Sequence, residues 1–205
     1  MPAKSPSKRN SSCYIGHLYK DFREAQEKDL IGVYLEMDTV YNTPRGPYIL
    51  TFIEPKTWFM FGKLLNKKTS ENVAKSLRQY KQVLSADFSV IFSTLLTDRG
   101  SEFYKVDMLQ FDEETGEKIT TVYYCDPMQS SQKPHFENNH NFIRDILPNE
   151  RDLHVLAQND IDLMFSHINS YPRKVLNGKT PYNAFDYLFG KWIIEKLKIA
   201  KIEKR

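Results

Sequence analysis

The sequence predicts a mixed α/β domain, because strand-like runs come first and helical segments dominate the second half of the chain. Three runs rich in apolar and aromatic residues follow one another at 33–41, 48–53 and 57–65. Their links are short, and the first link, "NTPRGP", consists of turn-forming residues. Links of this kind join antiparallel hairpins, so we expect the three strands to be neighbours in one sheet.

The following elements alternate between helix and strand. Residues 69–84 have a helical period, and Thr69 or Ser70 can cap that helix. The run "FSVIFSTLL" at 88–96 is apolar almost throughout, which predicts a fourth strand buried on both faces of a sheet. After an acidic turn at 112–118, the run at 119–126 predicts a fifth strand. Further helices are expected in four segments: 17–29, 134–147, 155–168 and 180–197.

The composition favours a reduced, cytoplasmic protein with one main domain. The chain has 205 residues and a net charge of +3, which permits a nucleic-acid partner without requiring one. Cys13 and Cys125 lie far apart and form no metal-type pair. No apolar run approaches the ~20 residues of a membrane span. The basic residues near both ends fit either phosphate contacts or solvated tails.

An aspartate inside the first predicted strand raises the question of a metal site. Asp38 follows Glu36 by two residues, and a buried charge costs several kcal/mol unless it is compensated. Asp38 either faces solvent or holds a cation. Asp98 comes directly after the fourth predicted strand, where open α/β sheets bind ligands. If the first and fourth strands are neighbours, the two carboxylates meet, and Mg²⁺ would remove their repulsion.

The predicted helix at 134–147 offers a third carboxylate. Its packing face has the helical spacing of an amphipathic segment and consists of Phe136, His140, Ile143 and Leu147. Glu137, Asn141 and Arg144 lie on the adjoining face. Glu137 would therefore sit near the helix start and point to the sheet edge. From spacing alone, a metal triad and three exposed acids both remain open.

Other interpretations of nearby residues are weaker. His135 and His140 are five residues apart, about 140° around a helix, so they do not share a face as zinc-binding histidines of H-E-x-x-H do. Glu36 fits a bystander on the strand, and Glu102 fits a partner of Arg99. The aromatic residues Trp58, Phe59 and Phe61 fit core packing better than base stacking.

Four blocks of the sequence resemble one family. They are "MDTV", "TDRGSEF", "CDPMQSSQKPHFENNHNFIRDILP" and "INSYPRKVLNGKTPYNAF", in this order between about 31 and 190. Together they resemble the transposases of the insertion-sequence family numbered thirty, which carry a retroviral-integrase-like catalytic core. The block at 168–185 is the most specific. The residues of that block that fit the family pattern are Asn169, Pro172, Arg173, Leu176, Lys179, Thr180, Pro181 and Phe185.

The resemblance implies a ribonuclease-H-like fold, with a five-stranded mixed sheet flanked by helices, and an Asp-Asp-Glu active site. Asp38, Asp98 and Glu137 would be the catalytic residues and would hold two Mg²⁺ or Mn²⁺ ions. The activity would be DNA cleavage at the element ends and strand transfer into a target duplex, by a homo-oligomer in the bacterial cytoplasm, associated with the nucleoid. The residues expected to contact DNA are Lys133, Asn138, Asn141, Arg144, Arg173 and Lys174.

Some positions depart from the family pattern. Arg99 stands where asparagine is usual, and Pro134 stands where glycine is usual. The 39 positions from Asp98 to Glu137 (137 − 98) exceed the common spacing. We expect a basic arm and short helix at 1–30, too short for the family's helix-turn-helix, a core at 31–190 and a basic tail at 191–205. A decayed, inactive binding module and a ribonuclease-H-type nuclease are the alternatives.

Overall fold

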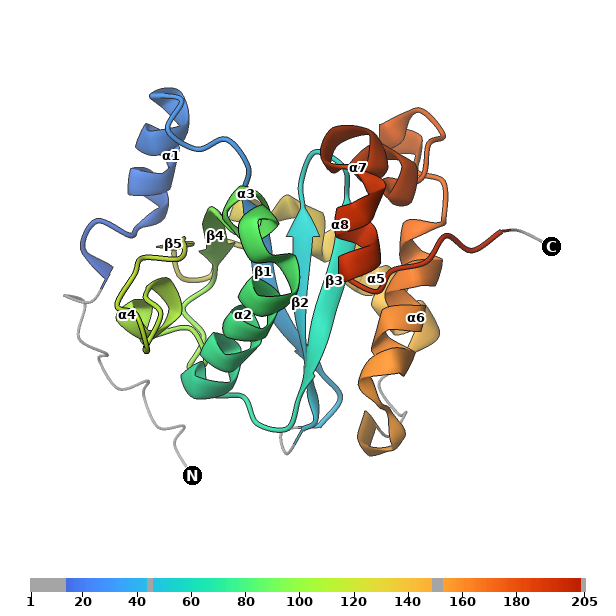
Figure 1. The fold of residues 1–205 in the computed structure, drawn as a ribbon, viewed down its shortest axis with the longest axis horizontal. Coiled ribbons are helices and arrows are strands. Elements are labelled where there is room, and N and C mark those ends of the chain that lie inside the picture. Colours follow the sequence, from blue (N-terminus) through green and yellow to red (C-terminus); the bar gives the residue numbers. More distant parts are fainter. Residues whose placement is uncertain (1–13, 44–45, 149–152, 204–205) are drawn as a thin grey trace.

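Figure 1 presents the fold in a computed structural model of the 205-residue chain. The structure describes residues 14–43, 46–148 and 153–203, while the side chains of residues 130 and 137–139 lie outside the described part. The expected arm at 1–12 and Cys13 also lie outside it. Within the described residues, none of the helices combines the length and the apolar character needed to cross a membrane.

The centre of the molecule is a five-stranded mixed sheet, as the sequence predicts. Its strands are β1 (Leu35–Tyr41), β2 (Tyr48–Glu54), β3 (Phe59–Leu65), β4 (Thr94–Thr97) and β5 (Thr121–Tyr124). The spatial order is β3-β2-β1-β4-β5. The first three strands form antiparallel hairpins, whereas β4 runs parallel to β1 and β5 runs parallel to β4. The first and fourth strands are therefore neighbours.

Helices cover both faces of the sheet. In Figure 1, α2 (Ser70–Leu84) crosses in front of the sheet and α5 (Pro134–Ile146) lies behind it. Thr69 caps α2 by accepting a hydrogen bond from the Asn72 N–H, as expected for this position. An aromatic cluster packs between α2 and the sheet and consists of Phe52, Phe61, Tyr80 and Phe92. The packing face of α5 is buried at Phe136 and Ile143.

Other helices flank the two edges of the sheet (Figure 1). At the β3 edge lie α6 (Gln158–Asn169), α7 (Pro181–Phe189) and α8 (Lys191–Lys196). At the β5 edge lies α1 (Tyr19–Glu27), and the Tyr124 N–H donates to the His17 carbonyl just before it. The short helices are η2 (Ser85–Asp87), α3 (Phe88–Ile91), α4 (Val106–Gln110), η3 (Ser130–Gln132), η4 (Leu153–Val155) and η5 (Lys174–Leu176).

The strand expected over 88–96 is wrong for most of its length. Helix α3 occupies 88–91, and β4 begins only at Thr94. Phe88, Ile91 and Phe92 are all buried, and their spacing of three and four residues is that of one helical face. Because every residue of the run is apolar or small, the helical period is hidden in a continuous apolar stretch.

The helix expected over 180–197 is interrupted. Gly190 has a φ of +90° and separates α7 from α8. A Cβ at this position would lie 1.9 Å from the nearest ring atom of Trp192, so the ring fills the space that a side chain would need. The positive φ and the close ring explain why a glycine breaks the helix here.

Candidate active site

The pairing of β1 with β4 places Asp38 beside Asp98. The last registered pair of these parallel strands is Glu36 with Leu96. Asp38 lies two residues beyond this pair within β1, and Asp98 lies two residues beyond it, directly after the end of β4. The two aspartates thus occupy matching positions where the parallel pairing ends, which is the place where such sheets bind ligands.

A buried lysine faces these carboxylates. The Nζ of Lys133 lies 3.1 Å from Asp38 Oδ2 and 3.2 Å from the carbonyl oxygen of Met37. Lys133 is only 7% exposed. Burial alone would lower the pKa of its ammonium group, but the carboxylates of Asp38 and Asp98 offset this effect and raise the pKa. Lys133 is therefore a permanent cation in contact with the site.

Asp98 has an unfavourable environment for its negative charge. Desolvation raises the pKa of its carboxyl, and the charges of Asp38 and Glu102 add to this rise. The charge of Lys133 and the N–H of Gly100, which donates to Asp98 Oδ1 at 2.8 Å, act in the opposite direction. The net pKa is raised although the residue is exposed to solvent. A bound cation would relieve this concentration of negative charge.

A glycine allows the carboxylates to converge. A Cβ added to Gly100 would lie 2.9 Å from Asp98 Oδ1 and 2.7 Å from Glu102 Oε2. Glu102 is buried, accepts a 2.7 Å hydrogen bond from the Thr39 hydroxyl and forms a 3.1 Å ion pair with Lys68. Arg99, the partner expected for Glu102, forms an ion pair with Asp126 at 3.3 Å.

The backbone brings the start of α5 to the same region. Lys133 directly precedes this helix and contacts Asp38, and Pro134 is its first residue. Glu137 lies in the first turn of α5, but its side chain and that of Asn138 lie outside the described part. Among the side chains that are described, no three His, Cys, Asp or Glu residues are grouped so as to hold a metal ion.

Glu36 is fully buried and pairs with the start of α5. Its Oε1 lies 2.7 Å from Nδ1 of His135, whose ring packs edge-on against Trp58. Its Oε2 has no hydrogen-bond partner among the described residues. The sequence predicts Glu36 to be a bystander of the aspartate, whereas this contact joins β1 to the first turn of α5.

The remaining predicted DNA contacts lie in different environments. Arg144 hydrogen-bonds to the Asn42 side chain and, at 3.0 Å, to the Tyr41 carbonyl, so it ties α5 to the end of β1. Asn141 is exposed on the same helix. Lys174 is also exposed, and it begins η5, in the loop between α6 and α7.

Arg173 is buried in spite of its charge. Its guanidinium lies 3.5 Å from the centre of the Phe142 ring on α5, and its Nη2 donates to the Ile168 carbonyl at 3.2 Å. Nε and Nη1 have no hydrogen-bond partner in the described part of the chain. Burial lowers the pKa of Arg173 to about 10, so the group remains charged at neutral pH.

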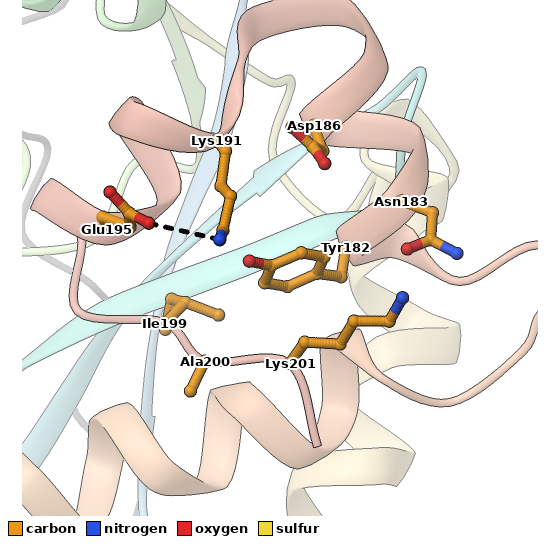
Figure 2. Close-up of a pocket in the computed structure, with 8 residues that line it drawn as sticks. All are labelled: Tyr182, Asn183, Asp186, Lys191, Glu195, Ile199, Ala200 and Lys201. Carbon is orange, nitrogen blue, oxygen red and sulfur yellow. Dashed lines mark ion pairs between the residues drawn. The ribbon is translucent and has the colours of Figure 1, made fainter. Parts of the chain in front are cut away.

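A separate pocket of about 560 Å³ lies between α7, α8 and the chain that follows α8. Figure 2 shows the residues that line it: Tyr182, Asn183, Asp186, Lys191, Glu195, Ile199, Ala200 and Lys201. Its acids and lysines are mixed, and the 3.5 Å ion pair of Lys191 with Glu195 lies on its rim. None of the described residues predicted for catalysis or DNA contact lines this pocket.

The fold of the chain is that of an integrase catalytic core domain. The crystal structure of the catalytic core domain of BIV integrase matches with a TM-score of 0.51, 16% identity, and coverage of 73% of this chain and 91% of that chain. The match confirms the predicted ribonuclease-H-like fold. No protein-family model matches the sequence.

The chain is similar in sequence to transposases of insertion sequences, among them IS30. It is 32% identical to the transposase InsI of IS30A from Escherichia coli K12, over 71% of this chain and 36% of that protein. The transposase of IS1086 from Cupriavidus metallidurans is 30% identical, over 58% of this chain and 33% of the relative. That of IS4351 from Bacteroides fragilis is 28% identical, over 74% and 44%. The chain thus spans about a third of the first relatives it matches.

Proposed function

We propose that this chain is the catalytic core of a DDE transposase, which cuts a DNA strand at an element end and joins the freed 3′-OH to a target duplex. The observation that carries the proposal is the matching position of Asp38 and Asp98, each two residues beyond the last paired residues of the adjacent parallel strands β1 and β4. The first turn of α5, with Glu137, follows directly on a residue that contacts Asp38. Similarity to transposases and to an integrase core supports the same reading.

The donor set fits two Mg²⁺ or Mn²⁺ ions. Asp38, Asp98 and Glu137 would offer carboxylate oxygens, the ligands that these hard cations prefer. The proposal is supported by the ammonium of Lys133 beside Asp38 and by the raised pKa of Asp98. When bound, the ions would supply an activated oxygen nucleophile and stabilise the leaving oxygen in a phosphoryl transfer.

The protein would orient the carboxylates through backbone donors. The N–H of Thr39 donates to Asp38 Oδ1 at 2.7 Å, and the N–H of Gly100 donates to Asp98 Oδ1 at 2.8 Å. Both contacts leave the Oδ2 atoms as the oxygens that can turn toward a cation. Exposed groups such as Asn141 and Lys174 would contact the DNA backbone without reading its sequence.

A strand-transfer assay tests the function. The full chain is incubated with pre-cleaved element ends, target duplex and Mg²⁺ or Mn²⁺, and products are resolved on a denaturing gel. We expect Asp38→Asn and Asp98→Asn to reduce joining by at least about a hundredfold, because each removes a charge from the site. Asp145→Asn, an exposed acid on α5, is the matched control and should behave as the wild type.

The same assay separates the alternatives. Equal joining by the wild type and by Asp98→Asn would contradict a role of this carboxylate in catalysis. DNA binding without any joining or cleavage would favour the inactive module. Degradation of an RNA–DNA hybrid in preference to duplex DNA would favour a ribonuclease-H-type nuclease. We further propose that the active form is a homo-oligomer in the bacterial cytoplasm. Light scattering with and without DNA would test the oligomeric state.

A further inference from the structure

The ammonium group of Lys133 lies among oxygen atoms and an aromatic ring. Its Nζ lies within hydrogen-bond distance of Asp38 Oδ2 and of the Met37 carbonyl, and 5.0 Å from the centre of the Phe136 ring. The lysine is buried, unlike the exposed lysines of surface ion pairs. Because burial removes water from the ammonium, the oxygen atoms of Asp38 and Met37 must compensate its charge.

The end of the strand pairing explains why a backbone oxygen is available to the ammonium of Lys133. Parallel pairing between β1 and β4 stops at Glu36 and Leu96, so the carbonyl of Met37 has no partner from the ladder. The hydroxyl of Thr97 donates to this carbonyl at 3.0 Å, and Lys133 donates to it at 3.2 Å. Where the pairing of β1 with β4 ends, the carbonyl oxygen of Met37 therefore lies next to the two aspartates.

Lys133 contacts Asp38 Oδ2, the oxygen of this carboxylate that is available to a metal. Asp38 Oδ1 already accepts the N–H of Thr39, so Oδ2 is the oxygen that remains free of backbone contacts. A divalent cation bound at Oδ2 would lie within a few ångström of the ammonium, and like charges at that separation repel strongly in a partly buried site. Metal and Lys133 cannot both occupy the position.

We propose that Lys133 is an internal counter-ion of Asp38 that competes with the divalent metal for Oδ2 and swings away from this oxygen when metal binds. The proposal rests on the metal site of the proposed function. It gives Lys133 a role as a positioning residue that sets metal affinity. Once released from Asp38, the same ammonium is available to a DNA phosphate, so metal loading and DNA contact would be coupled.

Metal titration of purified variants tests the competition. Isothermal calorimetry with Mn²⁺ compares the wild type, Lys133→Met and the matched control Lys75→Met, an exposed lysine on α2. We expect Lys133→Met to bind Mn²⁺ about tenfold more tightly than the wild type, because it removes a competing charge. Lys133→Arg keeps the charge and should stay within about twofold of the wild type. Equal or weaker binding by Lys133→Met overturns the proposal.

A second measurement does not depend on a variant that folds. Lysine acetylation of the wild type, followed by mass spectrometry with and without Mg²⁺, reports whether the amine of Lys133 becomes accessible. We expect its rate to rise at least about fivefold with Mg²⁺, while that of Lys75 stays constant. A rate at Lys133 that does not change with saturating Mg²⁺ overturns the release.

The failure of this proposal differs from the failure of the metal site. If Asp38→Asn and Asp98→Asn bind Mn²⁺ as tightly as the wild type, the metal site itself is misplaced and the proposed function loses its basis. If these two variants lose binding and Lys133→Met gains none, the metal site stands and only the competition by Lys133 is wrong.

Discussion

Asn169, the last residue of α6, forms two hydrogen bonds with the backbone of Met60 on the free edge of β3. Its Oδ1 accepts the Met60 N–H at 2.8 Å, and its Nδ2 donates to the Met60 carbonyl at 2.7 Å. At the start of the same helix, Gln158 contacts the Leu64 N–H and the Gly62 carbonyl in the same way. Two side-chain amides thus satisfy backbone groups on the outer edge of β3 that an added strand would use.

Removal of the Asn169 amide should destabilise the fold. In Asn169→Ala, a buried N–H and a buried carbonyl of β3 lose their partners, which costs about 1–3 kcal/mol for each unsatisfied group. We expect the unfolding free energy to fall by about 2–4 kcal/mol in urea denaturation. The exposed Asn183 on α7 provides the control, since Asn183→Ala removes an amide from solvent. Equal midpoints for both variants would show that the edge does not need the amide.

The stacking of Arg173 on Phe142 should couple the loop after α6 to α5. In Lys, the charge is a compact ammonium that cannot stack as a planar guanidinium does, so Arg173→Lys should lower the unfolding free energy by about 1–2 kcal/mol. Phe142→Leu should have a similar effect. A double-mutant cycle should give a coupling energy above about 0.5 kcal/mol. Strictly additive losses would mean that the two groups contribute independently. Lys174→Ala, at the exposed neighbour, is the control.

The elements of the sheet could be predicted from the sequence, but not all of their boundaries. Short turns and a capped helix predict β1 to β3 and α2 because these signals are local. The adjacency of β1 and β4 was only a condition for Asp38 and Asp98 to meet, and the strand order satisfies it. The segment at 88–96 failed because a run of apolar residues has no period that separates a strand from a buried helix turn.

The sequence indicates the candidate acids of the site but not the lysine that contacts one of them. Aspartates at strand ends are visible as residue types at element boundaries, whereas the partner of a lysine depends on tertiary contacts. Lys133 was assigned to DNA, yet it is buried against Asp38. The contact between Glu36 and His135 joins residues 99 positions apart, which spacing within one element cannot reveal.

The unfolding free energy at acidic pH should depend on Asp112, which anchors the turn at 112–118. Its carboxylate accepts a 2.8 Å hydrogen bond from the ammonium of Lys81 and further hydrogen bonds from the backbone N–H groups of Glu114 and Thr115. These contacts lower the pKa of Asp112 from 3.8 to about 2. A lowered pKa in the folded state contributes stability above the ordinary value, and that stability is lost as the pH falls from about 4 to about 2. Asp112→Asn should remove this part of the pH dependence.

Urea denaturation of the wild type and of Asp112→Asn between about pH 2 and pH 6 measures this effect. The variant should be less stable than the wild type near pH 6, and the difference should shrink as the pH approaches 2. Asp145→Asn, whose acid is exposed on α5, should follow the wild type throughout. A difference between wild type and Asp112→Asn that is independent of pH would assign the loss to packing instead of charge.

Gly100 should be needed for the metal site more than for the fold. A methyl group at this position would lie within 3 Å of the carboxylate oxygens of Asp98 and Glu102, which are mobile side-chain ends that can move away. The φ of Gly100 is not in the left-handed region, so alanine adds no backbone strain. We therefore expect Gly100→Ala to melt within about 3 °C of the wild type. Its Mn²⁺ affinity should fall about tenfold, because Asp98 is displaced from its position beside Asp38. Gly32→Ala, where the added Cβ meets no atom within 4 Å, controls for the substitution itself. Wild-type affinity in Gly100→Ala would show that Asp98 can bind metal from a shifted position, and that the narrow approach at Gly100 is not required.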